Sequence, residues 1–209
     1  PFVMYASFVN PHDIYRFRNI QNRIEPGKRE IDLPASRNDD LSEKPRCQKQ
    51  YLEEDQGTAA RGFGDDEWRK YLEVYYHLTE KVDGQIGRIL ETLRRTGLER
   101  ETIVVFTSDH GDLAGAHGLP FKGPCMYREL MEVPLAIRWP GEIPEGGVSQ
   151  KLVGHVDLLP TLCDLAGIEP PEDMQGRSLR PLLMGEDPPW REFIFGEYHS
   201  KQRWANPIR

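Results

Sequence analysis

An apolar run that ends in a cluster of polar and glycine residues decides how this sequence is interpreted. The stretch reads Thr102-Ile103-Val104-Val105-Phe106-Thr107-Ser108-Asp109-His110-Gly111. A short apolar run bounded by turn residues is typical of a strand buried on both faces, as in parallel sheets. An ordinary turn needs only one or two special residues. The acid and histidine here, followed by His117 and Lys122 among further glycines, therefore predict a loop that binds a ligand.

The flanking segments predict an α/β fold. Apolar residues recur every three or four positions from Trp68 to Leu93, which predicts a helix that Gly97 can close. A second helix is expected from His155 to Ala166, stopped at Gly167, with its regular part starting near Leu159. Alternating strands and helices favour a mostly parallel sheet sandwiched by helices. Besides Thr102–Phe106, the expected strands are residues 2–9, 133–139 and 193–198.

Composition excludes some classes of function. Of the 209 residues 38% are hydrophobic and 29% are charged, and 27 basic against 34 acidic side chains give a net charge of −7. This balance does not favour nucleic acid as a partner, since phosphate backbones require a basic surface. No window approaches the roughly 20 apolar residues of a membrane span. The three cysteines show no CxxC pairing, so neither a zinc site nor a disulfide framework is indicated; they are Cys47, Cys125 and Cys163.

Two polar clusters follow predicted strands. His12 lies in Asn10-Pro11-His12-Asp13, and Asp109 and His110 follow Thr102–Phe106. In a parallel sheet ligands bind outside the carboxyl ends of the strands, so both clusters are expected at one crevice. Asp109 and His110 could hold a divalent cation. Alternatively, Asp109 closes an Asx turn and His12 only makes a hydrogen bond at a strand end.

The glycine-rich loop adds two candidates. Lys122 is a compact point charge suited to an oxyanion such as sulfate or phosphate, and His117 can donate a hydrogen bond to a second oxygen. The alternative is a solvated lysine and a surface histidine. His155 and Asp157 could suggest a second metal site, but their position at a helix start favours capping.

The sequence resembles the sulfatase family of the alkaline phosphatase superfamily, and the resemblance runs across nearly the whole chain in the family's order. It implies an alkaline phosphatase-like fold with the start of a small C-terminal antiparallel sheet. On this basis residues 1–185 are expected to belong to the catalytic domain and residues 186–209 to a smaller subdomain. The matching features lie at residues 1–13, 82–88, 107–123, 133–135, 155–162, 165–168 and 175–179.

The resemblance also implies chemistry. Members hydrolyse sulfate esters with one calcium ion, Ca²⁺, and a formylglycine nucleophile made from cysteine or serine. Asp109 and His110 resemble the second pair of metal ligands. His12 resembles the histidine that contacts the sulfate and protonates the leaving oxygen, and Lys122 resembles the lysine that neutralises a sulfate oxygen. His117 resembles a less constant residue of the same loop and is expected to contact substrate.

The departures from the family pattern are large. The nucleophile motif, Cys or Ser followed by x-Pro-x-Arg, is absent, and so is the acidic pair that supplies the other metal ligands. We therefore expect the chain to be the later part of a sulfatase and to be inactive alone. Alternatives are a phosphodiesterase or phosphonate monoester hydrolase, and a non-catalytic oxyanion-binding module. The sequence does not identify the sulfate ester or show whether the protein forms a homo-oligomer. By resemblance the compartment could be periplasmic, extracellular or lysosomal.

Overall fold

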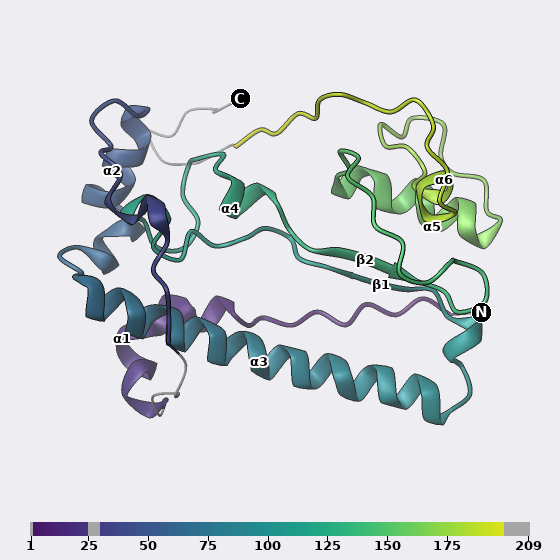
Figure 1. The fold of residues 1–209 in the computed structure, drawn as a ribbon, viewed down its shortest axis with the longest axis horizontal. Helices are drawn as coiled ribbons and strands as arrows, with labels where there is room; N and C mark the ends of the chain where they lie inside the picture. The colour runs from purple at the N-terminus through teal and green to yellow at the C-terminus, as the bar shows by residue number, and fades with distance from the viewer. Residues whose placement is uncertain (1, 25–29, 199–209) are drawn as a thin grey trace. The chain divides into compact units, whose positions relative to one another are not determined.

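The computed structural model describes residues 2–24 and 30–198. These residues fall into two compact units, which are described separately: the first comprises residues 2–24, 30–92, 108–133 and 197–198, and the second residues 93–107 and 134–196. The helices and strands labelled in Figure 1 are α1 (Phe17–Ile20), α2 (Arg46–Glu54), α3 (Asp65–Arg95), β1 (Val104–Thr107), α4 (Arg128–Met131), β2 (Leu135–Arg138), α5 (Leu158–Ala166) and α6 (Arg180–Leu183). Short 3-10 helices cover His12–Arg16, Gln21–Arg23, Ala35–Asn38, Gln56–Ala60, Glu99–Glu101, Ala116–Gly118 and His155–Asp157.

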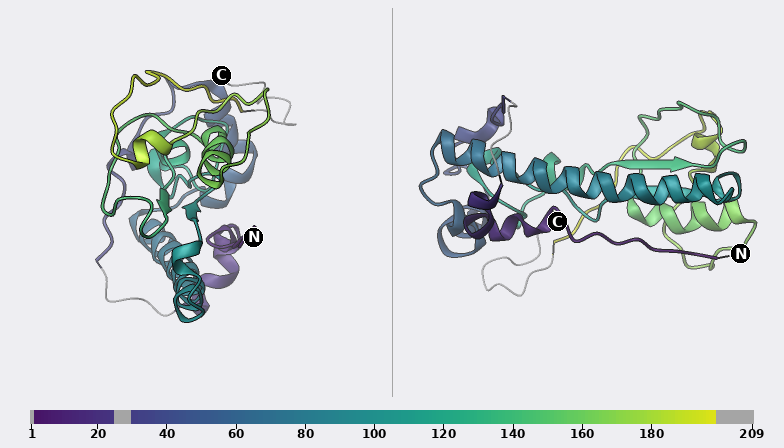
Figure 2. Two further views of the ribbon diagram at one scale, coloured as in Figure 1. Left: turned by 90° about the vertical axis from the view of Figure 1, so that its right-hand side faces the viewer. Right: turned by 90° about the horizontal axis from the view of Figure 1, so that it is seen from below.

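Helix α3 confirms the predicted amphipathic helix and appears as one continuous helix in the right-hand view of Figure 2. It begins at Asp65, but the side chain that satisfies a backbone donor there is Glu67, which accepts the Gly64 N–H at 2.9 Å. The helix ends before Gly97, whose φ of 74° is the expected left-handed turn. None of the helices in the described part of the chain combines the length and apolar character of a membrane span.

The core of the first unit is built on α3. Two clusters of buried side chains lie here, and both include residues of the glycine-rich loop that follows β1. The loop is thus anchored at several points in packed apolar interior, which limits its freedom to move. One cluster holds Ile14, Phe17, Ala60, Trp68, Tyr71, Val74, Leu78 and Phe121, and the other holds Tyr51, Leu113, Leu119, Cys125 and Leu130.

Helix α2 is an element that the sequence pattern did not reveal. Its buried side chains are Cys47, Gln48 and Tyr51, and two of these would not be counted as strongly apolar in a search for periodicity. The Tyr51 hydroxyl donates to the Pro120 carbonyl at 3.0 Å, and the Cys47 thiol lies 3.5 Å from the Pro124 carbonyl. Part of the long irregular region before α3 is therefore a helix that supports the glycine-rich loop.

The second unit contains β1, β2 and α5. The two predicted strands are present, but they pair antiparallel, with Val104 opposite Arg138. Helix α5 starts at Leu158, one residue before the expected position, and Gly167 (φ 66°) ends it as predicted. The described residues contain this two-stranded sheet and not a larger parallel one.

The strands predicted at residues 2–9 and 193–198 are wrong for this structure. Both segments are irregular, apart from an isolated bridge at Tyr198, and no other strand in the described ranges pairs with residues 2–9. Their large apolar side chains are exposed, for example Val3 at 84% and Phe195 at 89%. A strand needs a neighbour for its N–H and C=O groups, and an apolar run cannot adopt sheet structure without one.

Candidate functional site

The loop from residue 108 to residue 123 has an unusual backbone. Ala114, His117 and Phe121 adopt positive φ values of 48°, 56° and 56°. Such values are uncommon outside glycine, and strained backbone clusters at functional sites. Gly111 is required for a different reason: a Cβ there would lie 1.9 Å from the Glu129 carbonyl oxygen, so only glycine permits this approach of the two backbone segments.

Three of the predicted site residues are in direct contact. Asp109 Oδ2 lies 3.3 Å from His110 Nε2, and Lys122 Nζ donates to the same Nε2 at 2.6 Å. His110 Nδ1 lies 2.7 Å from the Gly111 carbonyl, which can only accept, so Nδ1 carries the proton and Nε2 presents its lone pair. The Asp109 side chain is 83% exposed, so its oxygens are accessible from outside the core.

Local hydrogen bonds orient Asp109 without satisfying it. Its Oδ1 accepts the His110 N–H at 3.0 Å and faces the Ser108 hydroxyl at 3.4 Å. Partial burial opposes ionisation, but the backbone N–H groups of His110 and Asp109 and the Lys122 ammonium favour the charged form, and the pKa of Asp109 lies below its usual value. The carboxylate is therefore ionised at neutral pH. The bond to the adjacent N–H differs from an Asx turn, which would reach two residues onward.

Asp112 is a carboxylate of this loop that sequence reasoning missed. It accepts the Ala114 N–H at 2.8 Å, and the Tyr71 hydroxyl lies 3.5 Å away. Burial raises the pKa of Asp112 to about 6, although the Ala114 N–H and the nearby His110 and Lys122 lower it. The sequence signal was its place in Asp109-His110-Gly111-Asp112, but nothing there indicates which acid faces the core.

His12 belongs to the same unit but reaches the loop through other rings. Its imidazole stacks on Tyr15, with ring centroids 4.7 Å apart. Tyr15 in turn stacks on Phe121, the residue before Lys122, at 4.0 Å. His12 is an exposed residue, so the imidazole has a supported face and can still meet a ligand.

His117 makes contacts separate from this group. Its Nδ1 lies 2.7 Å from Asp39 Oδ2 and its Nε2 3.8 Å from Glu129 Oε2. The ring also stacks on Tyr127 at 3.6 Å. The structure thus brings Asp109, His110 and Lys122 together directly, and gives His117 two carboxylate neighbours of its own. Asp39 and Glu129 carry no sequence signal, because their pairing with His117 depends on tertiary contacts.

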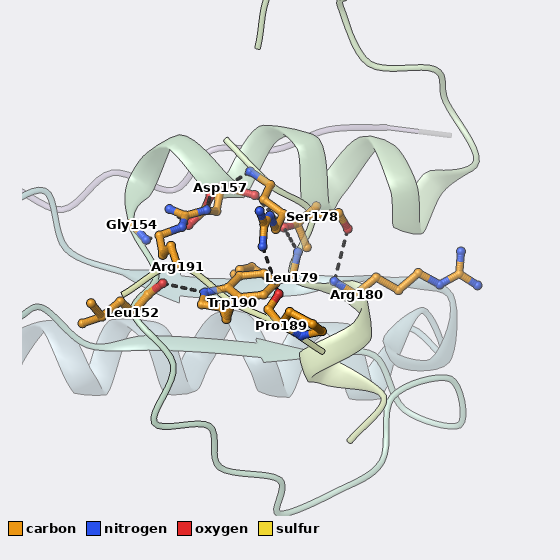
Figure 3. A network of polar contacts seen from close by, with 11 residues as sticks. Leu152, Gly154, Asp157, Ser178, Leu179, Arg180, Pro189, Trp190 and Arg191 are labelled. Carbon is orange, nitrogen blue, oxygen red and sulfur yellow. Dashed lines mark hydrogen bonds and ion pairs between the residues drawn. The ribbon is translucent and has the colours of Figure 1, made fainter. Parts of the chain in front are cut away.

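Asp157 caps a helix start, the role that its position in the sequence favours over a second metal site. It accepts the Gly154 N–H at 2.8 Å and so caps the helical turn, and it also accepts the Arg177 N–H at 2.8 Å. Figure 3 shows Arg191 reaching the same carboxylate, with contacts of 2.6 and 3.1 Å. The Trp190 ring lies beside both arginines, and its Nε1 donates to the Leu152 carbonyl.

Comparison with known proteins identifies the family. A family model described as Sulfatase matches residues 1–168. The chain belongs to the sulfatase family. Among curated relatives, a Delta 4,5-hexuronate-2-O-sulfatase of Bacteroides thetaiotaomicron is 33% identical over 98% of this chain and 44% of its own length. An arylsulfatase K of Danio rerio is 37% identical over 66% of this chain and 27% of its own length.

Similarity to solved structures identifies the fold of this chain. A 2-O GAG sulfatase matches 93% of the chain and 44% of its own length, with a TM-score of 0.75 and 32% identity. A phosphonate monoester hydrolase from Silicibacter pomeroyi matches 80% of the chain and 35% of its own length, with a TM-score of 0.69 and 33% identity. The alkaline phosphatase-like fold is thereby confirmed. The chain spans less than half the length of the curated relatives described above.

Proposed function

We propose that this chain forms part of an enzyme that hydrolyses sulfate esters, with Asp109, His110, Lys122 and His12 contributing to its active site. The observation that carries the proposal is the contact of Asp109, His110 and Lys122 on one strained loop of a sulfatase-family chain. The names of its relatives, which include a hexuronate 2-O-sulfatase and an N-acetylglucosamine-6-O-sulfatase, favour a sulfated sugar as the substrate.

Asp109 and His110 are the proposed ligands of a divalent cation, with calcium chosen by family resemblance. The 3.3 Å between Asp109 Oδ2 and His110 Nε2 fits adjacent ligands of one cation, whose bonds to calcium are about 2.3–2.6 Å. No group of three or more acidic, histidine or cysteine ligands occurs among the described residues. The remaining ligands are therefore expected from elsewhere in the protein. When bound, the cation would supply positive charge that orients and polarises a sulfate oxygen.

Lys122 is proposed to neutralise a second sulfate oxygen. An ammonium group has three N–H donors, and the contact with His110 Nε2 uses one of them. Two donors are left for a sulfate. Because Lys122 also occupies the His110 lone pair, it has to release this nitrogen when a cation binds there.

His12 is proposed as the general acid. As the S–O bond of the ester breaks, its electron pair goes to the leaving oxygen, which takes a proton from the His12 imidazole. By family resemblance, the nucleophile that forms the new bond to sulfur is expected to be the hydrate of a formylglycine. It would lie elsewhere in the protein, since this sequence contains no Cys or Ser followed by x-Pro-x-Arg. His117 is proposed to contact the substrate. Its Nδ1 already pairs with Asp39, so Nε2 is the ring nitrogen proposed to make that contact.

Hydrolysis of a phosphonate monoester is the second candidate function. Its specific support is the likeness to phosphonate monoester hydrolases at 33% and 32% identity. The same side chains suit a tetrahedral phosphoryl group, because a cation and a lysine neutralise either oxyanion.

Steady-state kinetics of the intact protein that contains this chain would decide between the two functions. Purified protein is assayed in the presence of calcium with three substrates: 4-nitrophenyl sulfate, a 2-O- or 6-O-sulfated sugar, and 4-nitrophenyl phenylphosphonate. We expect the highest kcat/KM on a sulfate ester. A higher value on the phosphonate would favour the second function, and no hydrolysis of any substrate would favour an oxyanion-binding module.

A further inference from the structure

Three stacked rings link two of the proposed active-site residues that are distant in the sequence. The His12 and Tyr15 rings lie 4.7 Å apart with 19° between their planes, and the Tyr15 and Phe121 rings 4.0 Å apart with 13° between theirs. Phe121 directly precedes Lys122. The stack therefore begins at the proposed general acid and ends beside the proposed sulfate-binding lysine.

The local backbone explains the first half of the stack. His12 and Tyr15 occupy the 3-10 helix His12–Arg16. Side chains three residues apart eclipse in a 3-10 helix, so the two rings necessarily lie on the same face. Ile14 between them is buried at 1% exposure and joins the core cluster that also contains Phe121.

Phe121 explains the second half. It is 3% exposed and adopts a φ of 56°, which a bulky residue rarely does unless its surroundings require it. Its carbonyl accepts the Leu113 N–H at 2.7 Å, and its ring lies against Tyr15 and Tyr71. Because the Phe121 ring is held in the core, the backbone at Phe121 is fixed as well. This backbone determines the position of the next residue, Lys122.

Tyr15 contributes its ring and not its hydroxyl. The hydroxyl oxygen is buried and has no hydrogen-bond partner among the described residues. Burial, with a further effect of Asp112, raises the pKa of Tyr15 to about 12. The backbone N–H of Lys122 opposes this rise, but its geometry falls short of a hydrogen bond to the Tyr15 oxygen. The phenol is therefore neutral at physiological pH, and an unsatisfied buried hydroxyl does not stabilise the fold. A phenylalanine could replace it at this position.

We propose that Tyr15, seated on Phe121, is a positioning residue that holds the His12 imidazole at a fixed place relative to Lys122. This inference rests on the proposed function. It assigns to the ring pair the alignment of proton donor and sulfate-binding lysine, which displacements of about 1 Å can disrupt with losses of about 10²-fold.

The test compares Tyr15→Leu with Tyr15→Phe in the intact protein, using aryl sulfates whose leaving groups differ in basicity. A poor leaving group needs the proton from His12, whereas 4-nitrophenolate leaves readily without it. We expect Tyr15→Leu to lower kcat on phenyl sulfate by about 10- to 100-fold and to have a much smaller effect on 4-nitrophenyl sulfate. Tyr15→Phe should resemble the wild type on both substrates.

Phe17→Leu is the matched control. Phe17 is a buried aromatic residue of the same core cluster that contacts Phe63 and Tyr71 and makes no ring contact with His12. It should lower thermal stability without changing the ratio of rates on the two substrates. Equal loss on both substrates in Tyr15→Leu, or the same substrate dependence in Phe17→Leu, would overturn the proposal.

A spectroscopic measurement separates this proposal from the proposed function. The NMR shifts of the His12 imidazole protons should carry a ring-current contribution that Tyr15→Phe retains and Tyr15→Leu loses. If the wild type hydrolyses no sulfate ester, the proposed function fails, and the positioning proposal fails with it. If the enzyme is active but the His12 shifts are the same in Tyr15→Leu, the positioning proposal alone fails.

Discussion

Two aspartates that each lie close to a histidine in the sequence have opposite environments. The Asp157 side chain is 0% exposed and accepts hydrogen bonds from two backbone N–H groups and from Arg191. The Asp109 side chain is 83% exposed, and within the described residues the ion-pair partner of its Oδ2 is the adjacent imidazole. The first carboxylate is saturated with donors from its own unit. The second retains lone pairs that a ligand can use.

The difference shows how a structural acid is distinguished from a binding acid. A buried carboxylate is tolerated only when it is fully paired, so its partners reveal a role in stability. An exposed carboxylate that is oriented by short local bonds and adjoins another ligand atom costs little to keep open. The two Asp- and His-containing motifs look alike in the sequence, and only the hydrogen-bond partners of each aspartate distinguish them.

The largest effect is expected from removing the saturated carboxylate. Asp157→Ala leaves Arg191 and two backbone N–H groups without their acceptor, so the free energy of unfolding should fall by about 3–5 kcal/mol. Asp109→Ala in the same protein should change it by no more than about 0.5 kcal/mol. Denaturant titration followed by circular dichroism measures both. If both variants lost the same free energy of unfolding, the proposed contrast between a stabilising Asp157 and an open Asp109 would be wrong.

The next effect concerns turnover at the open site. Lys122→Ala in the intact enzyme should lower kcat on a sulfate ester by about 10²-fold or more, because charge on the sulfate oxygens shifts as the S–O bond breaks. Lys49→Ala is the control, since this lysine makes a solvent-exposed pair with Glu53 on α2 and should leave kcat unchanged. An unaltered kcat in Lys122→Ala would remove this lysine from the site.

A smaller effect is expected on metal binding. Asp109→Asn keeps the size of the side chain but removes its charge, so the calcium affinity of the intact protein should fall by about tenfold or more. Isothermal titration with calcium measures this without requiring activity. Asp157→Asn, where it folds, should bind calcium as the wild type does. A loss of affinity in Asp157→Asn alone would move the metal site to the second unit.

The smallest effect is expected at an acid of intermediate exposure. Hydrogen bonding from the Ser178 hydroxyl, assisted by Arg180 and opposed by slight burial, lowers the pKa of Asp164. The folded state thus prefers the ionised form, and this contribution is present above the unfolded pKa of about 3.9. It is lost as the pH falls through the lower folded value.

Asp164→Asn should therefore destabilise the protein by no more than about 1 kcal/mol at pH 7, because the group is partly exposed. The difference from the wild type should shrink as the pH falls below about 4. Thermal denaturation at pH 7 and at pH 3 measures it. A difference that is the same at both pH values would show that the stabilisation is unrelated to ionisation.

Patterns local in the sequence predicted α3, β1, β2 and α5, but not α1, α2, α4 or α6. The periodicity from Trp68 to Leu93 reports α3 because a helix buries one stripe of side chains whatever it packs against, and Gly97 and Gly167 mark ends that only glycine adopts readily. The apolar run at residues 2–9 failed as a strand, since pairing requires a second segment in space. Helix α2 was missed because its buried face uses Cys47 and Gln48.

By itself the sequence determined the residues available for chemistry: two acids, two histidines and a lysine in a glycine-rich loop, with His12 about a hundred residues earlier. It also determined the family, through an ordered series of motifs. The tertiary structure alone decided that Lys122 contacts His110, that Asp157 is saturated, and that Tyr15 joins His12 to Phe121. The physical reason is that contacts between distant segments depend on burial and backbone direction, which no local spacing encodes.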